Sequence, residues 1–242
     1  MAYARRLLAV GIAVAPLICS SARADIAIAV VGPMTGRFAL LGEQIKRGAE
    51  MAVRDLNAQG GVLGQKVSLL VGDDACEPKT AVKVAKEMAD KKVKFVAGHL
   101  CSAASIGASA IYAKRGIVMI SPVSTNPMLT DAAFRKGWKS IFRVSGRDDA
   151  QGVVAGKFLA TEYKGQKVAI VHDGSAYGKG LAEVTRKSMR AVGAHEAMYE
   201  AYAAGQKSFA ALISKMKTAG ISAVFIGGDY ADAWRIIAPA SA

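Results

Sequence analysis

The segment KFVAGHLCSAASIGASAIYAKRGIVMI, residues 94–120, decides the fold class of this chain. It begins with an apolar run at 94–97 that predicts a strand and continues with a run at 103–113 that predicts a helix. A second apolar run at 117–120 predicts another strand. A strand, a helix and a strand in this order form a βαβ unit with parallel strands and a right-handed connection. The segment therefore predicts an α/β protein.

The same alternation of strands and helices extends in both directions from this unit. Further strands are expected at 26–31, 67–71, 141–144, 167–171, 197–202 and 223–226. Further helices are expected at 42–57, 78–90, 150–163, 178–191 and 209–219. The strands are nearly continuous apolar runs, which is typical of parallel sheets covered by helices on both faces.

The stretch 124–140 shows neither the alternation typical of a strand nor the three-to-four-residue spacing typical of a helix, and it is expected to be irregular. Because it separates two series of strands and helices, we predict two Rossmann-like lobes with parallel sheets, joined near 144–147. The expected division is a signal peptide at 1–24, an N-terminal lobe at 25–145 and an incomplete C-terminal lobe at 146–242.

The N-terminus has the features of a secretory signal peptide. Arg5 and Arg6 precede the apolar run Leu7–Ile18, and Ala22-Arg23-Ala24 offers small residues for cleavage. The run is too short for a membrane-spanning helix, which needs about 20 residues. A buried first helix is the alternative, and Cys19 raises the possibility of lipid attachment, but ordinary cleavage before Asp25 fits best. The mature protein is therefore expected in the periplasm.

Charge and cysteine content narrow the function further. The chain has 32 Lys and Arg against 19 Asp and Glu, a formal net charge of +13. The basic residues are spread along helices without interleaved aromatics, so we expect a solvated surface and no nucleic acid partner. Cleavage leaves Cys76 and Cys101, an even pair that predicts a disulfide in an oxidising compartment. His99, His172 and His195 lack metal-ligand spacing, so we expect them to be structural or exposed.

Ligands of open α/β sheets bind beyond the carboxyl ends of the strands, so those positions contain the candidate site. Ser102 begins a helix and is either an N-cap or a contact to an anion at the positive helix end. Val123 and Thr125 follow a strand and offer a carbonyl and a hydroxyl, or form an ordinary turn. Tyr177 starts a helix of the second lobe and either closes over a ligand or packs at the rim.

Catalytic motifs are absent from the sequence. There is no G-x-S-x-G elbow, and the glycine-rich segment 174–180 lacks the spacing and the Ser or Thr of a phosphate loop. Asp73 and Asp74 are adjacent carboxylates without a second acid or base, so we expect them to make hydrogen bonds at the rim. We predict a protein that is not an enzyme and holds no cofactor or metal.

At these residues the chain resembles the leucine/isoleucine/valine-binding proteins of bacterial ABC transporters, which are periplasmic binding proteins of type I. The resemblance extends from Asp25 to about Gly228. The matching stretches are Val30-Val-Gly-Pro-Met-Thr-Gly36, Gly72-Asp-Asp-Ala-Cys-Glu-Pro-Lys79, Gly98-His-Leu-Cys-Ser102, Ile120-Ser-Pro-Val-Ser-Thr125 and Ile170-Val-His-Asp-Gly-Ser-Ala-Tyr-Gly178.

The resemblance implies two lobes that close on a free amino acid and deliver it to an inner-membrane ABC permease. The expected partners are therefore a leucine-, isoleucine- or valine-like ligand and that permease, and the expected state is a monomer. The alternatives are a binding protein for amides, urea or aromatic acids, a ligand-sensing module of a signalling system, and an exported hydrolase.

The same resemblance assigns roles to individual residues. Cys76 and Cys101 match the family's disulfide. Ser102 and Thr125 match residues that hold the ligand's carboxylate and ammonium, and Val123 matches a carbonyl that accepts from the ammonium. The full set of expected ligand-binding residues is Ser102, Val123, Ser124, Thr125, Tyr177 and Tyr230.

Three departures from the family pattern accompany the match. Leu41 stands where similar proteins often have Tyr, and Asp229 occupies the position of a ligand-facing Tyr, with Tyr230 next to it. The family also has a later strand with an ammonium-binding acid, to which nothing corresponds here. We therefore expect a C-terminally truncated chain that binds leucine weakly or not at all.

Overall fold

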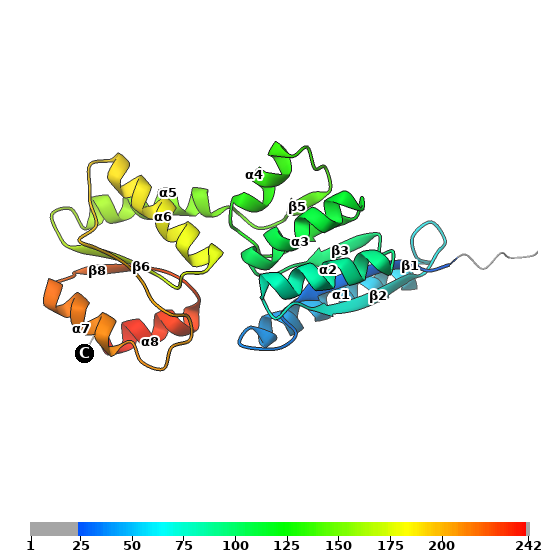
Figure 1. Cartoon of the computed structure of the whole chain (residues 1–242), viewed down its shortest axis with the longest axis horizontal. Helices are drawn as coiled ribbons and strands as arrows, with labels where there is room; N and C mark the ends of the chain where they lie inside the picture. The colour runs from blue at the N-terminus through cyan, green and yellow to red at the C-terminus, as the bar shows by residue number, and fades with distance from the viewer. Residues whose placement is uncertain (1–23, 241–242) are drawn as a thin grey trace, which may run out of the picture.

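The computed structural model describes residues 24–240 and contains two parallel sheets, each covered by helices (Figure 1). The segment predicted as a signal peptide lies outside the described residues up to Arg23, and so does Cys19. Between residues 24 and 240, no helix has both the length and the apolar character needed to cross a bilayer.

The first sheet has five parallel strands in the order β2-β1-β3-β4-β5. Together with helices α1 to α4 it forms what we call the first lobe. Its strands are β1 (Ile26–Gly32), β2 (Val67–Asp73), β3 (Phe95–Gly98), β4 (Val118–Ser121) and β5 (Ile141–Arg143). Its helices are α1 (Ala39–Ala58), α2 (Pro78–Asp90), α3 (Ser102–Lys114) and α4 (Met128–Arg135).

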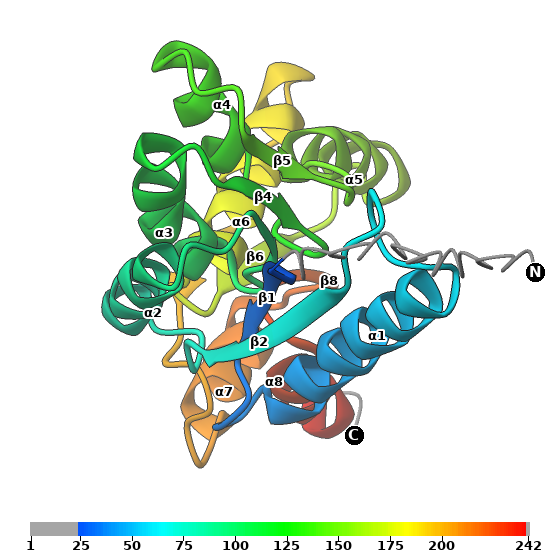
Figure 2. The same cartoon turned by 90° about the vertical axis from the view of Figure 1, so that its right-hand side faces the viewer.

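The second sheet has three parallel strands in the order β7-β6-β8 and, with helices α5 to α8, forms the second lobe. Its strands are β6 (Val168–His172), β7 (Met198–Ala201) and β8 (Ala223–Gly227). Its helices are α5 (Asp148–Glu162), α6 (Ala176–Ala191), α7 (Ala210–Ala219) and α8 (Tyr230–Ala240). The predicted α/β class and parallel sheets are thus confirmed, and the chain passes between the lobes at residues 144–147 (Figures 1 and 2).

One element of the first lobe was not expected. The stretch 124–140, expected to be irregular, contains helix α4. Leu129 and Ala133 lie four residues apart on one face of α4, and both are buried in the first-lobe core. Asn126 accepts the N–H of Met128 at 2.9 Å and so satisfies a donor at the start of the helix. The prediction of an irregular stretch was wrong because two apolar positions are too few to reveal a helical period.

The centre of the second lobe is strand β6, whose five residues are all buried. Val168 and Ile170 pack on one side with residues such as Leu159 and Met189, whereas Ala169 and Val171 pack on the other side with α7 and α8. Because successive side chains of a strand point to opposite faces, a strand covered on both faces must be apolar throughout. The two-sided core therefore holds β6 in place up to His172, and the residues that follow it lie at the edge of the sheet.

Helices α5 and α6 pack closely against each other, and glycine makes this possible. A Cβ atom built on Gly156 would lie 2.5 Å from the Thr185 carbonyl oxygen and 2.7 Å from the Ser188 Cβ atom. A Cβ atom on Gly152 would lie 2.8 Å from Val184. The two helix backbones therefore approach more closely than any side chain larger than hydrogen allows.

We expect Gly156→Ala to lower the free energy of unfolding by about 1–3 kcal/mol, since the added methyl group forces α5 and α6 apart. Gly48→Ala is the matched control, because Gly48 lies in the exposed part of α1 with no atom within 4 Å of an added Cβ. That substitution is expected to stabilise the protein by about 0.5–1 kcal/mol. Urea denaturation of the three proteins measures both effects, and equal midpoints for Gly156→Ala and the parent would contradict the packing described.

Candidate functional site

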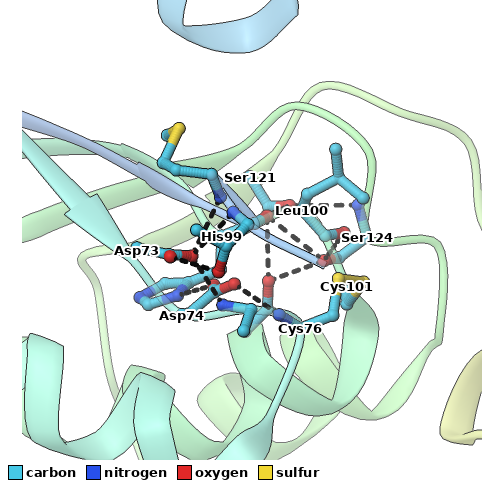
Figure 3. Close-up of a disulfide and its surroundings, with 12 residues drawn as sticks. Asp73, Asp74, Cys76, His99, Leu100, Cys101, Ser121 and Ser124 are labelled. Atoms are coloured by element: carbon cyan, nitrogen blue, oxygen red, sulfur yellow. Dashed lines mark hydrogen bonds and ion pairs between the residues drawn. A yellow bond between two sulfur atoms is a disulfide. The ribbon is translucent and has the colours of Figure 1, made fainter. Parts of the chain in front are cut away.

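Loops after neighbouring strands of the first sheet meet at one edge, as parallel pairing requires (Figure 3). A disulfide between Cys76 and Cys101 joins the loop after β2 to the loop after β3, with Cα atoms 5.4 Å apart. The predicted disulfide is confirmed. It lies beside the start of α3, so it holds Ser102 and the residues before it in a defined position.

His99 organises the interior of this edge. Its ring lies 2.5 Å from the Asp74 carboxylate through Nδ1 and 3.1 Å from the Tyr112 hydroxyl through Nε2. All three side chains are fully buried. The carbonyl oxygen of His99 accepts hydrogen bonds from Ser121 at 2.6 Å and Ser105 at 3.1 Å. His99 is thus structural, which agrees with the expectation from sequence.

Asp73 fixes the loop that follows β1. Its carboxylate accepts from the Thr35 hydroxyl at 2.6 Å and from the N–H groups of Met34 and Ala75, both at 2.9 Å. Burial by itself would raise the pKa of Asp73, but these hydrogen bonds outweigh burial and lower it. The hydrogen bonding expected at the rim is thus present for Asp73, whereas the expectation is wrong for Asp74, which is fully buried and bonds the His99 ring and the Cys76 N–H.

Ser102 is the first residue of α3, and its side chain is 4% exposed. The N-cap position is Cys101, and no side chain caps the helix. Ser102 Oγ instead accepts the backbone N–H of Asn126 at 3.3 Å. The interpretation of Ser102 as an N-cap is therefore wrong, because the strand end places it one residue inside the helix.

The segment after β4 contributes residues with different accessibility. Ser124 is buried, and its hydroxyl contacts the Ser105 hydroxyl at 2.6 Å and the Leu100 carbonyl at 2.8 Å. The Val123 side chain is exposed, whereas Thr125 is half-buried. The hydroxyl of Ser124 thus bonds within the first-lobe interior, whereas Thr125 contacts the second lobe, since its carbonyl accepts the N–H of Asp148.

Asp148 is a residue of the site that the sequence interpretation missed. It begins α5, and its N–H donates to the Thr125 carbonyl at 3.0 Å. Its side chain is fully buried, and neither carboxylate oxygen has a partner with hydrogen-bond geometry among residues 24–240, although the Thr125 side chain and the Arg143 charge lie close enough to stabilise the carboxylate in part. Burial raises the pKa of Asp148, and the Thr125 side chain and the Arg143 charge offset this only in part. The sequence did contain a sign of this role, since Asp148 is an acid soon after the end of a strand. It was overlooked because the predicted helix began two residues later, at 150.

Tyr177 and Asn126 bring the second lobe to the same place. Asn126 Nδ2 donates to the Ala176 carbonyl at 2.6 Å across the two lobes. Burial and then the charges of Asp148 and Asp173 raise the pKa of the half-buried Tyr177. Tyr177 therefore lies within electrostatic reach of Asp148. Contacts through Asn126 and the Thr125 carbonyl connect Ser102, Thr125, Asp148 and Tyr177, and we call these four residues the inter-lobe group.

Tyr230 does not join the inter-lobe group. It is the first residue of α8 and is 77% exposed. Asp229 beside it caps α8 by accepting the N–H of Ala231 at 2.9 Å. The other two histidines are also structural or exposed, as expected: His172 Nδ1 accepts the N–H of Gly174 at 3.1 Å, and His195 is exposed.

Comparisons with known proteins identify relatives of this arrangement. A family profile described as "Periplasmic binding protein" matches residues 25–242. The chain is 47% identical over 214 residues to "Leu/Ile/Val-binding protein homolog 2" of Brucella abortus, covering 88% of this chain and 57% of that protein. It is 42% identical over 236 residues to "Amino acid binding protein" of Pseudomonas aeruginosa, covering 97% and 62% of the two chains.

A solved structure shows the same fold. The substrate-binding protein LivJ of a branched-chain amino acid transporter of Streptococcus pneumoniae, in complex with isoleucine, matches with a TM-score of 0.77 at 30% identity. The match covers 90% of this chain and 61% of that one. The chain thus spans between 57% and 62% of the length of these relatives.

Replacing both Cys76 and Cys101 by Ser is expected to lower the free energy of unfolding by about 3 kcal/mol, because the disulfide restricts the unfolded chain. The bridge spans 25 residues of sequence, which sets this estimate. Guanidinium denaturation with and without reductant measures the effect. The double variant is its own control, since reductant should destabilise the parent and leave the variant unchanged. A parent that is insensitive to reductant would contradict the prediction.

Proposed function

Because the chain belongs to the periplasmic binding protein family, whose members bind solutes rather than transform them, we propose that it captures a free amino acid of the leucine, isoleucine and valine class between its lobes. One observation carries the proposal: the buried carboxylate of Asp148, which makes no hydrogen bond among residues 24–240, shares the inter-lobe group with Ser102 at the start of α3. A zwitterionic amino acid has the two charges that suit these two positions.

The start of α3 supplies the anion side of the site. The first N–H groups of a helix have no partner within the helix, and the helix dipole places partial positive charge there. An α-carboxylate would accept hydrogen bonds from these N–H groups and from the Ser102 hydroxyl. The disulfide next to this position keeps the N–H groups aimed in one direction before the ligand arrives.

Asp148 supplies the cation side. A buried carboxylate without partners is costly in free energy, and an ammonium group that pairs with it removes much of that cost. We assign the ligand's ammonium to Asp148, with the Thr125 hydroxyl and the Val123 carbonyl as further acceptors. Tyr177 covers the ligand from the second lobe. Asp148 thus takes the part of the acid that the sequence comparison with the family left without a counterpart.

The remaining predicted site residues take supporting places in this proposal. Ser124 orients Thr125 through its hydrogen bonds to the first-lobe interior and does not contact the ligand through its hydroxyl. Tyr230, exposed at the start of α8, contacts the ligand only at the rim of the second lobe.

The proposal extends to the setting in which the protein works. Residues 1–24 direct export to the periplasm, residues 25–145 and 146–242 act as two domains, and 144–147 is the hinge. The ligand is passed to an inner-membrane ABC permease by a monomeric binding protein. The relatives named for Leu/Ile/Val binding and the LivJ complex with isoleucine support the part of this proposal that concerns amino-acid binding for a transporter.

Asp148→Asn tests the proposal with a pair of ligands. Leucine carries both charges, whereas 4-methylpentanoic acid is the same molecule without the ammonium group. We expect the substitution to weaken leucine binding at least about tenfold, since charge-assisted contacts are worth about 1.5–3 kcal/mol. Binding of 4-methylpentanoic acid should not weaken. Isothermal titration calorimetry at high ligand concentration measures both.

Asp149→Asn is the matched control, because Asp149 is the adjacent acid but is exposed and paired with Arg147. It should leave leucine binding unchanged. The unliganded Asp148→Asn protein should also be more thermostable than the parent, because burial costs the charged carboxylate more free energy than Thr125 and Arg143 restore. Equal loss of leucine binding in both Asn variants, or no binding of any branched-chain amino acid by the parent, would overturn the proposal.

A further inference from the structure

The two lobes are also joined by a group of charges far from the crossover at 144–147. Arg37, in the loop between β1 and α1, donates to Asp229 and to Asp232, the latter at 3.0 Å. These partners are 192 and 195 residues away in sequence and lie at the start of α8. In Figure 1 the crossover runs along the top of the molecule, whereas the loop before α1 and helix α8 lie toward the bottom. We call Arg37, Asp229 and Asp232 the clasp.

Both acids of the clasp are held in place by their own lobe. Asp232 has a side chain that is only 2% exposed and accepts the N–H of Gly205 at 2.8 Å. Asp229 caps α8 through the N–H of Ala231 and has a side chain that is 14% exposed. The second lobe therefore presents two fixed acceptors, and only Arg37 has to be ordered when the clasp forms.

The environment of Arg37 strengthens this attraction. Burial by itself lowers the pKa of Arg37, but the hydrogen bonds and charges of Asp232 and Asp229 outweigh it and raise the pKa. The guanidinium also lies over the Phe38 ring, 5.0 Å from its centre. A partly shielded, two-partner ion pair of this kind is worth more than a single pair exposed to water.

We infer that Arg37 is a positioning residue for ligand capture, because the clasp stabilises the closed arrangement of the lobes. Asn126 and the crossover act as the pivot on one side, where Asn126 bonds Ala176. The clasp acts on the other side and opposes opening. The effect on ligand binding rests on the proposed function, whereas the effect on the distance between the lobes does not.

The expected size of the effect follows from population shift. The apparent Kd equals the intrinsic Kd divided by the fraction of closed molecules. If loss of the clasp lowers that fraction about threefold, for example, the apparent Kd rises by the same factor. For a partly exposed ion pair of this type we expect the apparent Kd to rise about three- to tenfold. Because the lobes must open before the ligand can leave and the clasp opposes opening, most of the change should appear as faster release.

Lobe distance in the absence of ligand is the decisive measurement. Spin labels on cysteines introduced at Arg54 and Lys217, which are exposed residues of different lobes, report the distance by double electron–electron resonance. Cys76 and Cys101 are disulfide-bonded and do not react with the label. We expect Arg37→Gln and Asp229→Asn to shift the distribution to longer distances. Asn retains the helix cap at 229, so a shift there reports the lost charge.

Two further variants complete the test. Arg47→Gln is the matched control, since it removes an arginine that pairs with Glu43 within α1 and joins no lobes. It should leave the distance unchanged, and Arg37→Lys should restore part of the closed population. An Arg37→Gln distribution identical to that of the parent would overturn the inference, whatever the outcome of ligand titrations.

The ligand measurements separate this inference from the proposed function. Stopped-flow fluorescence should show faster leucine release from Arg37→Gln with little change in the association rate. Asp148→Asn should weaken leucine binding without moving the labels apart. If no amino acid binds the parent but Arg37→Gln still opens the lobes, the proposed function fails and the clasp stands.

Discussion

Parallel pairing of strands is the constraint on which the rest of this structure depends. In the first sheet Gly32 pairs with Asp73 and Val31 with Gly98, so the strands end at the same level. Gly98 is necessary at this point, because it has φ +147° and an added Cβ would lie 2.1 Å from the Val31 carbonyl oxygen. The loops that leave these strand ends have little freedom, and the disulfide removes more of it.

The polar groups behind the strand ends of the first sheet form hydrogen bonds with one another, whereas the nearby Asp148 carboxylate does not take part. His99, Asp74 and Tyr112 form a fully buried set of mutual partners, and the neighbouring serine hydroxyls share the His99 carbonyl. Asp148 is buried to the same degree, but within the described part of the chain neither of its carboxylate oxygens makes a hydrogen bond. Buried polar groups are normally hydrogen-bonded, and this contrast is the reason for assigning the Asp148 carboxylate to the ligand in our proposal. Arg143 Nε and the hydroxyls of Tyr199 and Tyr202 are also buried without a hydrogen bond among the described residues.

The two lobes have separate apolar cores, and polar contacts join them. The first core centres on β1, β3 and α3, and the second lobe packs around β6. Between the lobes lie the Asn126–Ala176 hydrogen bond and the ion pairs of Arg37. Polar contacts can be exchanged for water when lobes move apart, whereas an apolar interface would resist separation. This arrangement suits a protein in which a bound ligand and a few charges decide how closed the molecule is.

The sequence by itself determined the α/β class, nearly every strand and helix, the disulfide pair and the positions of Ser102, Thr125 and Tyr177 near strand ends, because each depends on local period or on the direction of parallel strands. Tertiary structure decided the rest. Helix α4 depends on Leu129 and Ala133, which are buried only because α4 packs against the first-lobe core. Ser102 lies one residue inside α3 because the helix begins after Cys101. The burial of Asp148 and the meeting of Arg37 with Asp229 arise from residues far apart in the chain. Burial and long-range charge contacts are properties of the packed molecule, and no pattern of neighbouring residues encodes them.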